Sequence, residues 1–290
     1  VEHEVGDVME PDSIARAIEG CDAVLHSAAM YSLDRRKARQ IKTVNVQGTR
    51  NVIGEAVRRG LDPIIHVSSI AALLPPENGE ILTPDSGIKN PPGAYLSSKA
   101  DSERIARRYR EEGKPVVIVN PGGILGPHDP HGGENVAIIR QILATRVAAL
   151  PSGGLNIVDV RDLGTLFARL TESGKGPRGF VAGRYMTTKE MVETAGRLTG
   201  RSLKYRRIPR GVATTVGRLG DLLQWLSPWR IIANYEGVYT ITLGAACDDS
   251  ATWKPLGLTT RSTDETVADA IRWMVDAGHL KPKHAGTLAD

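Results

Sequence analysis

The chain has 290 residues, of which 41% are hydrophobic and 24% are charged, a balance typical of globular proteins with a substantial core. Its net charge of +4 is too weak, and its basic stretches are too poor in interleaved aromatic residues, to indicate a nucleic-acid partner. The sequence contains no apolar run of 18 residues, which excludes a membrane-spanning helix, and its two isolated cysteines favour neither a disulfide framework nor a zinc site.

Short apolar runs alternate with helix-compatible stretches through the first two-thirds of the chain. Runs of four or five β-branched residues are typical of strands that are buried on both faces of a parallel sheet. In chain order, the pattern predicts a strand at residues 1–5, a helix at 12–18, a strand at 22–26, a helix at 43–59, a strand at 63–69, a helix at 94–110 and a strand at 115–120. This alternation predicts an α/β fold built on a doubly wound parallel sheet.

The rest of the chain predicts a smaller and more helical lobe. A helix is expected at residues 135–145, and another after residues 158–162, with Asp162 as its N-cap. The sequences TTKE at 187–190 and STDE at 262–265 are capping boxes, and each precedes an apolar-periodic helix.

Two parts of the chain are therefore distinguished. Residues 1–127, with returning elements around 154–182, are expected to form the sheet domain. Residues 128–153 and 183–290 are expected to form most of the second lobe. No internal repeat divides the chain further.

Small and polar residues follow each predicted strand. In open parallel sheets, ligands bind beyond the carboxyl ends of the strands, where small residues let a flat ligand approach the backbone. The clusters are Gly6-Asp7-Val8, His26-Ser27-Ala28-Ala29, Ser68-Ser69 and Asn120-Pro121-Gly122-Gly123. Four clusters at consecutive strand ends predict a ligand site along this edge, although Ala28 and Ala29 fit simple close packing equally well.

Tyr95 and Lys99 are four residues apart in a stretch that predicts a helix, so their side chains share one helix face. This spacing alone is common on helix surfaces. A phenol has a pKa near 10 and is a poor base at neutral pH. An ammonium at roughly 4 Å, in an effective dielectric constant near 20, contributes about 4 kcal/mol, enough to bring the pKa of the phenol close to neutral. The pair is therefore a candidate for acid–base catalysis.

Eight motifs occur in an order that is familiar from one family. They are GDV at 6–8, HSAA at 26–29, NVQGTRNV at 45–52, HVSS at 66–69, YLSSK at 95–99, NPGGILGP at 120–127, VDVRDL at 158–163 and ETVADAIRWM at 265–274. Together they resemble the extended short-chain dehydrogenases/reductases, the NAD-dependent epimerase/dehydratase superfamily. Within it, the chain is most similar to dihydroflavonol-reductase-like and hopanoid-associated sugar-epimerase-like members. The resemblance implies a Rossmann-like NAD(P)-binding domain beside a substrate-binding lobe.

The resemblance also implies catalytic roles for matching residues. Tyr95 would exchange a proton with a substrate hydroxyl or carbonyl, and Ser69 would hydrogen-bond the reacting oxygen. Lys99 would support Tyr95 and contact the nicotinamide ribose. Asn45 matches the family asparagine near the adenosine half of the cofactor and the proton path. The alternative that Asn45 is an ordinary polar helix residue with no catalytic role stays open.

The implied cofactor is NAD(P)(H), and no metal is expected. The expected cofactor contacts are Asp7, Val8, Ala28, Ala29, Tyr31, Asn45, Ser68, Tyr95, Lys99, Pro121 and Gly122. Asp7 and Val8 would bracket the adenine, and residues 28–29 would admit the pyrophosphate side. Pro121 and Gly122 would face the nicotinamide carboxamide.

The start of the chain departs from the family pattern. The glycine-rich turn that holds the pyrophosphate at a helix N-terminus has no counterpart near residue 1, and the residue that separates NAD from NADP is missing with it. If residues 1–5 are the third strand in the order 3-2-1-4-5-6, two central strands are absent. We therefore expect a fragment that lacks roughly 50–60 upstream residues, including a Gly-x-x-Gly-x-x-Gly turn, with a naturally short protein as the alternative.

The implied function is an NAD(P)-dependent oxidoreductase that moves a hydride between nicotinamide and a secondary alcohol or ketone of a small-molecule substrate. A sugar-nucleotide epimerase or dehydratase is the alternative, because such a site needs cations to bind the diphosphate and the sequence contains candidates. The candidate cations are Arg140, Arg206, Arg207 and Arg230. A non-catalytic scaffold that kept the fold is a further alternative. The few cysteines and the polar start predict a cytoplasmic protein, and a homodimer stays open.

A late basic and apolar segment carries a separate prediction. Residues 201–230 contain seven Lys or Arg and one acidic residue, and within them 211–229 is amphipathic to apolar. We expect a lid helix that covers the mouth of a site for an apolar substrate, with a peripheral membrane contact as the alternative.

Other conspicuous residues are given structural roles. Trp225, Trp229 and Trp273 fit packing. His66, on a buried run, is interpreted as a hydrogen-bonded core histidine, and the GPHDPH stretch at 126–131 is interpreted as a loop rather than a metal site.

Overall fold

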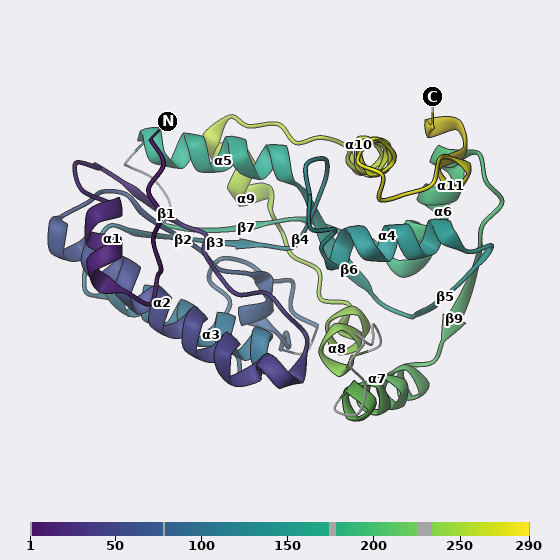
Figure 1. Cartoon of the computed structure of the whole chain (residues 1–290), viewed down its shortest axis with the longest axis horizontal. Helices are drawn as coiled ribbons and strands as arrows, with labels where there is room; N and C mark the ends of the chain where they lie inside the picture. The colour runs from purple at the N-terminus through teal and green to yellow at the C-terminus, as the bar shows by residue number, and fades with distance from the viewer. Residues whose placement is uncertain (1, 78, 174–177, 225–233, 290) are drawn as a thin grey trace.

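The computed structural model describes residues 2–77, 79–173, 178–224 and 234–289. At its centre lies a parallel sheet in the order β1-β2-β3-β7, formed by β1 (Val24–His26), β2 (Ile64–Val67), β3 (Val116–Pro121) and β7 (Gly179–Ala182) (Figure 1). The strands predicted at 22–26, 63–69 and 115–120 are therefore confirmed. So is the α/β fold with a parallel sheet.

Helices cover both faces of this sheet (Figure 1). One face carries α1 (Pro11–Ala17), α2 (Ala38–Arg59) and α3 (Ala94–Glu111), and the other carries α5 (Val160–Ser173) and α9 (Ser250–Trp253). Successive strand residues point to opposite faces. Ile64 accordingly packs with Ile53 of α2, whereas its neighbour Ile65 packs with Leu166 of α5. The continuous apolar runs in the sequence follow from this double burial.

The predicted strand at residues 1–5 is wrong for the part that the structure describes. Residues 2–6 form no strand, and the side chain of Val5 is 92% exposed. The chain instead turns into α1, where Ser13 Oγ accepts a hydrogen bond from the Asp7 N–H. In the described structure β1 is an edge strand that pairs with β2. A strand needs a neighbouring ladder, and residues 2–5 have none there.

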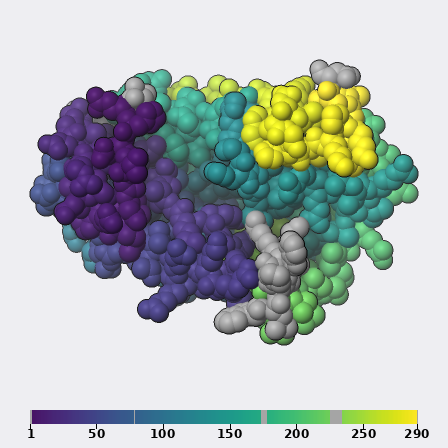
Figure 2. Space-filling model, in the orientation of Figure 1, coloured from purple at the N-terminus to yellow at the C-terminus, as the bar shows by residue number. Residues whose placement is uncertain are grey.

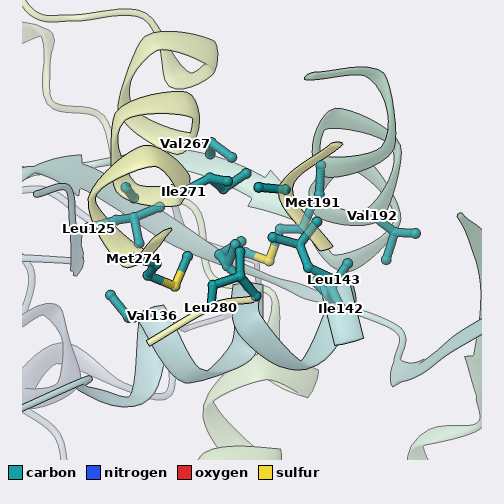
Figure 3. Close-up of a cluster of buried hydrophobic side chains, with 14 of the residues drawn as sticks. Leu125, Val136, Ile142, Leu143, Met191, Val192, Val267, Ile271, Met274 and Leu280 are labelled. Atoms are coloured by element: carbon teal, nitrogen blue, oxygen red, sulfur yellow. The ribbon is translucent and has the colours of Figure 1, made fainter. Parts of the chain in front are cut away.

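The second lobe combines short sheets with helices. Its strands are β4 (Gly123–Leu125), β5 (Val147–Pro151), β6 (Gly154–Asp159), β8 (Arg184–Thr187) and β9 (Lys204–Ile208), and its helices are α4 (Glu134–Ala144), α6 (Thr188–Thr199), α7 (Arg210–Gln224), α8 (Tyr235–Leu243), α10 (Thr263–Asp276) and α11 (Pro282–Ala285). β4-β6-β8 form one sheet and β5-β9 another, so β9 does not extend the central sheet. The aliphatic cluster in Figure 3 forms the core, in which Leu143, Val192 and Ile271 are fully buried. Figure 2 shows this lobe to the right of the sheet domain.

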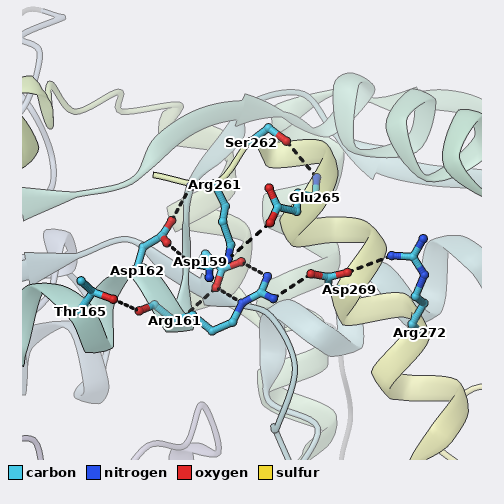
Figure 4. Close-up of polar contacts among 9 residues, drawn as sticks. All are labelled: Asp159, Arg161, Asp162, Thr165, Arg261, Ser262, Glu265, Asp269 and Arg272. Atoms are coloured by element: carbon cyan, nitrogen blue, oxygen red, sulfur yellow. Dashed lines mark hydrogen bonds and ion pairs between the residues drawn. The ribbon is translucent and has the colours of Figure 1, made fainter. Parts of the chain in front are cut away.

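Ion pairs fix the start of α5 against α10 (Figure 4). Arg161 bonds to the buried Asp159 and, across 2.8 Å, to Asp269 of α10. The helix begins at Val160, so the prediction that Asp162 caps it is wrong. Asp159 accepts the Arg161 N–H instead, because it ends β6 one residue before the helix. Asp162 pairs with Arg261.

The other capping predictions fare better. Thr187 and Glu190 form a complete capping box at the start of α6, and Ser262 accepts the Glu265 N–H at the start of α10. Trp273 packs against the core of the second lobe, as expected. Trp225 and Trp229 lie outside the described residues. Among the helices of the described ranges, none combines the length and apolar character needed to cross a bilayer.

Candidate active site

Tyr95 and Lys99 lie in the first two turns of α3. Lys99 is 7% exposed, and its Nζ donates a hydrogen bond across 3.0 Å to the carbonyl of Val67, the last residue of β2. Tyr95 is partly buried, and its ring packs edge-on against the ring of Tyr31, with 4.5 Å between the centroids. The helical spacing thus directs both side chains toward the carboxyl ends of β1 and β2.

The two serines after β2 have different surroundings. Ser69 is half-buried, and its Oγ accepts the N–H of Ala71 at 3.2 Å, capping the short 3-10 helix Ile70–Leu73. Ser68 is 2% exposed, and its Oγ donates a hydrogen bond to Glu103 across 2.6 Å. Ser69 is therefore accessible to a ligand, whereas Ser68 belongs to an internal network.

Asn45 joins the loop after β1 to α3. It is 3% exposed; its Oδ1 accepts the Met30 N–H at 2.7 Å, and its Nδ2 donates to Ser98 Oγ at 2.9 Å. Ser98 Oγ in turn donates to the carbonyl of Tyr95 at 2.7 Å. Asn45 therefore holds the Tyr95 turn in place through its amide, without exposing that amide to solvent.

The small residues predicted to contact a cofactor lie at two strand ends. Residues 27–29 are exposed after β1, next to Tyr31, which is 47% exposed. Pro121 ends β3, and Gly122 follows. A Cβ at Gly122 would lie 2.5 Å from the carbonyl oxygen of Asn156, so only glycine fits where the chain passes β6.

Val8 lies against the middle of α2, and the preceding Asp7 is bonded to Ser13 of α1. Asn51 Nδ2 donates to the carbonyl of Val8 at 2.9 Å, and a Cβ at Gly48 would lie 2.7 Å from Val8 Cγ2. Asp7 is exposed, and its carboxylate accepts the N–H of Met9. The described hydrogen bonds thus connect Val8 to α2 and Asp7 to Ser13 of α1, rather than to the group around Tyr95.

The environment of Tyr95 raises the pKa of its phenol above the usual value of 10. Burial is the larger cause, and the nearby Glu236 carboxylate adds to it. Burial also lowers the pKa of Lys99 to about 8, which the Glu103 carboxylate opposes. The expectation that the pKa of Tyr95 falls close to neutral is therefore wrong for this arrangement, because the effect of burial dominates. The phenol keeps its proton at neutral pH.

Two buried carboxylates that the sequence patterns did not predict lie at the site. Glu103 is fully buried and accepts hydrogen bonds from Ser68 and from Asn120 Nδ2, while pairing with Arg107 one helical turn later. Its i,i+4 spacing to both Lys99 and Arg107 was a usable signal. Glu236, from α8, accepts the N–H of Leu96 at 2.6 Å, and no local pattern in the sequence marks it.

The imidazole of His66, in the middle of β2, forms no hydrogen bond with the described residues. Its side chain is 2% exposed and stacks on His26 with 5.6 Å between the ring centroids. Neither ring nitrogen of His66 has a hydrogen-bond partner among the described residues, so the interpretation as a hydrogen-bonded core histidine is wrong. Burial lowers the pKa of both imidazoles, that of His26 to about 4, so both rings are neutral at physiological pH.

Comparison with known proteins identifies the family. Residues 2–183 match the profile of the NAD dependent epimerase/dehydratase family, which is more than half of the chain. The chain belongs to the NAD-dependent epimerase/dehydratase family. This membership confirms the predicted resemblance and the predicted nicotinamide cofactor as a property of the family, without choosing between NAD and NADP.

Several relatives match nearly the whole chain. A putative dihydroflavonol 4-reductase of Synechocystis sp. is 27% identical over 96% of this chain and 82% of the relative. The sterol demethylase protein B of Methylococcus capsulatus is 29% identical over 97% of this chain and 87% of the relative. A solved structure of a dTDP-glucose 4,6-dehydratase from Streptomyces venezuelae, with NAD and TYD bound, shares the fold with a TM-score of 0.71 at 22% identity, over 96% of this chain and 80% of that one.

The residues around Tyr95 fit the nicotinamide half of such a cofactor. Lys99 offers an ammonium donor at the end of β2, and no side chain projects from Gly122 after β3. Among the residues that the structure describes, no glycine-rich turn of the kind that binds a pyrophosphate joins a strand to a helix. The fit therefore concerns the reacting end of the cofactor.

Proposed function

We propose that the chain is an NAD(P)-dependent reductase of ketones, which acts in the reverse direction on secondary alcohols. The observation that carries this proposal is the placement of Tyr95 one helical turn from the buried Lys99, whose Nζ reaches the end of β2, where Ser69 is accessible. The nicotinamide, when bound, supplies the hydride. In this proposal the sheet domain holds the dinucleotide, and residues 128–153 and 183–290 hold the substrate.

The side chains of the site would supply and stabilise the proton transfer to the ketone oxygen. Tyr95 donates its proton to the carbonyl oxygen of the ketone as hydride reaches the carbonyl carbon, and Ser69 Oγ donates a hydrogen bond to the same oxygen. Lys99 stabilises the negative charge that develops on the phenol oxygen as the proton leaves. A raised phenol pKa keeps the proton on Tyr95 before reaction, which suits the reductive direction. Such acid–base help contributes roughly 10²–10⁴-fold to rate.

An apolar ketone fits the site better than a sugar nucleotide. Helix α8, which reaches the first turn of α3 through Glu236, has the sequence YEGVYTITL and carries no cation that could bind a diphosphate. The full-length similarity to a protein named for sterol chemistry supports the same substrate class. The alternative, a sugar-nucleotide epimerase or dehydratase, is supported by the shared fold of the Streptomyces enzyme and by the exposed Arg206 and Arg207.

Cofactor consumption by matched substrates tests the proposal. Thermal-shift titration with NADH and NADPH first establishes which dinucleotide binds. Loss of the reduced cofactor is then followed spectroscopically with sterol and isoprenoid ketones, and separately with UDP- and dTDP-sugars. We expect turnover of apolar ketones that is lost in Tyr95→Phe. Turnover of sugar nucleotides alone would favour the epimerase or dehydratase, and cofactor binding without any turnover would favour a scaffold.

A further inference from the structure

Helix α7 presents large aliphatic side chains to the solvent. Val212, Val216, Leu219 and Leu223 recur at helical spacing along one side, and Leu222 lies at its border. These five side chains are between 49% and 62% exposed. We call them the aliphatic face of α7. A contiguous exposed surface of this kind marks an interaction site more often than chance scatter of apolar residues does.

The opposite, buried side of α7 consists of small residues and, in its last turn, of Asp221 and Gln224. Ala213, Gly217 and Gly220 are buried, and Gly217 packs so closely on the start of α8 that a Cβ there would lie 3.0 Å from the Cα of Tyr235. An amphipathic helix normally turns its large apolar residues toward the core. Helix α7 packs through glycine and alanine and leaves its valines and leucines outside. Within the described residues, the fold therefore leaves the aliphatic face of α7 unburied.

The exposed charges of α7 and of β9, the strand that precedes it, are positive. The exposed cations of β9 and α7 are Lys204, Arg206, Arg207, Arg210 and Arg218. The acidic residue in these two elements, Asp221, is 9% exposed and lies 3.9 Å from Arg35. No exposed carboxylate offsets the cations within β9 and α7 as described.

We propose that the aliphatic face of α7 docks the protein on an anionic lipid surface. Valine and leucine side chains would enter the acyl boundary, and the flanking arginines and lysine would meet lipid phosphates, which is the arrangement of interfacial amphipathic helices. Pairing with a second copy is disfavoured, because a two-fold contact through this face would bring the same cations together. In Figure 1, α7 lies beside α8 at the lower margin of the molecule.

Vesicle sedimentation tests the proposal without substrate or cofactor, so its result is independent of the proposed activity. The chain is mixed with vesicles of phosphatidylcholine alone, or of phosphatidylcholine and phosphatidylglycerol in equal parts. We expect binding to the anionic vesicles that weakens with added salt, since the screening length falls to about 10 Å at 0.1 M. The affinity of the variant Val216→Ser/Leu219→Ser/Leu223→Ser for these vesicles should be lower by a factor of at least roughly ten. The control Val5→Ser/Ile81→Ser removes exposed apolar residues elsewhere and should bind like the parent chain.

A fluorescence measurement keeps the test decisive if the triple variant fails to fold. In a Cys21→Ser background, an environment-sensitive dye is attached at Leu219→Cys or, as the control, at Ile81→Cys. Cys247 should stay unlabelled, because burial raises its pKa to about 12. We expect a blue shift with anionic vesicles at position 219 only. Absence of vesicle binding, equal shifts at both positions, or a wild-type dimer that the triple variant dissociates would overturn the proposal.

Discussion

The carboxylate of Glu236 caps helix α3 from a distance of 140 residues in sequence, accepting the backbone N–H of Leu96 across 2.6 Å. The first N–H groups of a helix have no partner within the helix, and a carboxylate there is stabilised by the helix dipole. Glu236 is 8% exposed. Because Leu96 follows Tyr95, this one contact connects α8 of the second lobe to the turn that positions the phenol.

Glu236 should make stability depend on pH near neutrality. Burial raises the pKa of its carboxyl from 4.5 to about 7. Because the folded pKa is the higher one, the stability this gives is fully present below about pH 4.5 and is lost as pH rises through about 7. In urea denaturation, Glu236→Gln should gain on the order of 3 kcal/mol relative to the parent chain between these limits. Parallel stability profiles for the two proteins would contradict this assignment.

Gly93 should tolerate no side chain. Its φ is +89°, and a Cβ would lie 2.3 Å from Cδ of Glu236. Gly93→Ala should therefore lower the free energy of unfolding by at least roughly 2 kcal/mol, through backbone strain and displacement of Glu236. Gly113→Ala is the matched control, because Gly113 has a φ of +76° with nothing within 4 Å. Equal losses in both variants would show that the contact with Glu236 is unimportant.

Tyr95→Phe should keep the fold and the affinity for the dinucleotide while lowering turnover at least about a hundredfold, the lower end of general acid–base contributions. The ring still packs on Tyr31, so thermal unfolding should change little. Steady-state kinetics and cofactor titration on the same preparation check both halves. Near-normal turnover would remove Tyr95 from the mechanism.

Lys99→Met should reduce turnover and dinucleotide affinity together. The substitution removes the charge that supports the phenol and a donor for the cofactor ribose, while the aliphatic part of the side chain still packs. Lys114→Met, at an exposed position after α3, serves as the control and should leave both unchanged. If Lys99→Met altered only the unfolding temperature, its role would be structural.

Substitution of Ser68 should mainly lower stability, and substitution of Ser69 should mainly lower activity. Ser68→Ala leaves the buried Glu103 carboxylate without one of its donors, which should cost about 1–3 kcal/mol in unfolding free energy. Ser69→Ala should instead lower turnover, with a smaller effect on stability because Ser69 is only half-buried. The two variants are compared by urea denaturation and by kinetics. The reverse pattern would exchange the roles given to the two serines.

Local patterns in the sequence determined most of the secondary structure and the positions of the reacting groups. Buried strands produce continuous β-branched runs, and the spacing of Tyr95 and Lys99 follows from the helical repeat. The capping box at Thr187 is also local, because its donors and acceptors lie within four residues. These features depend on neighbours along the chain, so they can be read without knowing the fold.

Tertiary structure decided what depends on distant neighbours. A strand at residues 2–5 needs a ladder that only packing can supply. Burial and Glu236 raise the pKa of Tyr95. Glu103 accepts a hydrogen bond from Ser68, which distinguishes that buried serine from the accessible Ser69. The outward valines and leucines of α7 likewise follow from the close packing of Gly217 on α8. Periodicity identifies the two sides of a helix, and only the packed structure chooses which one is buried.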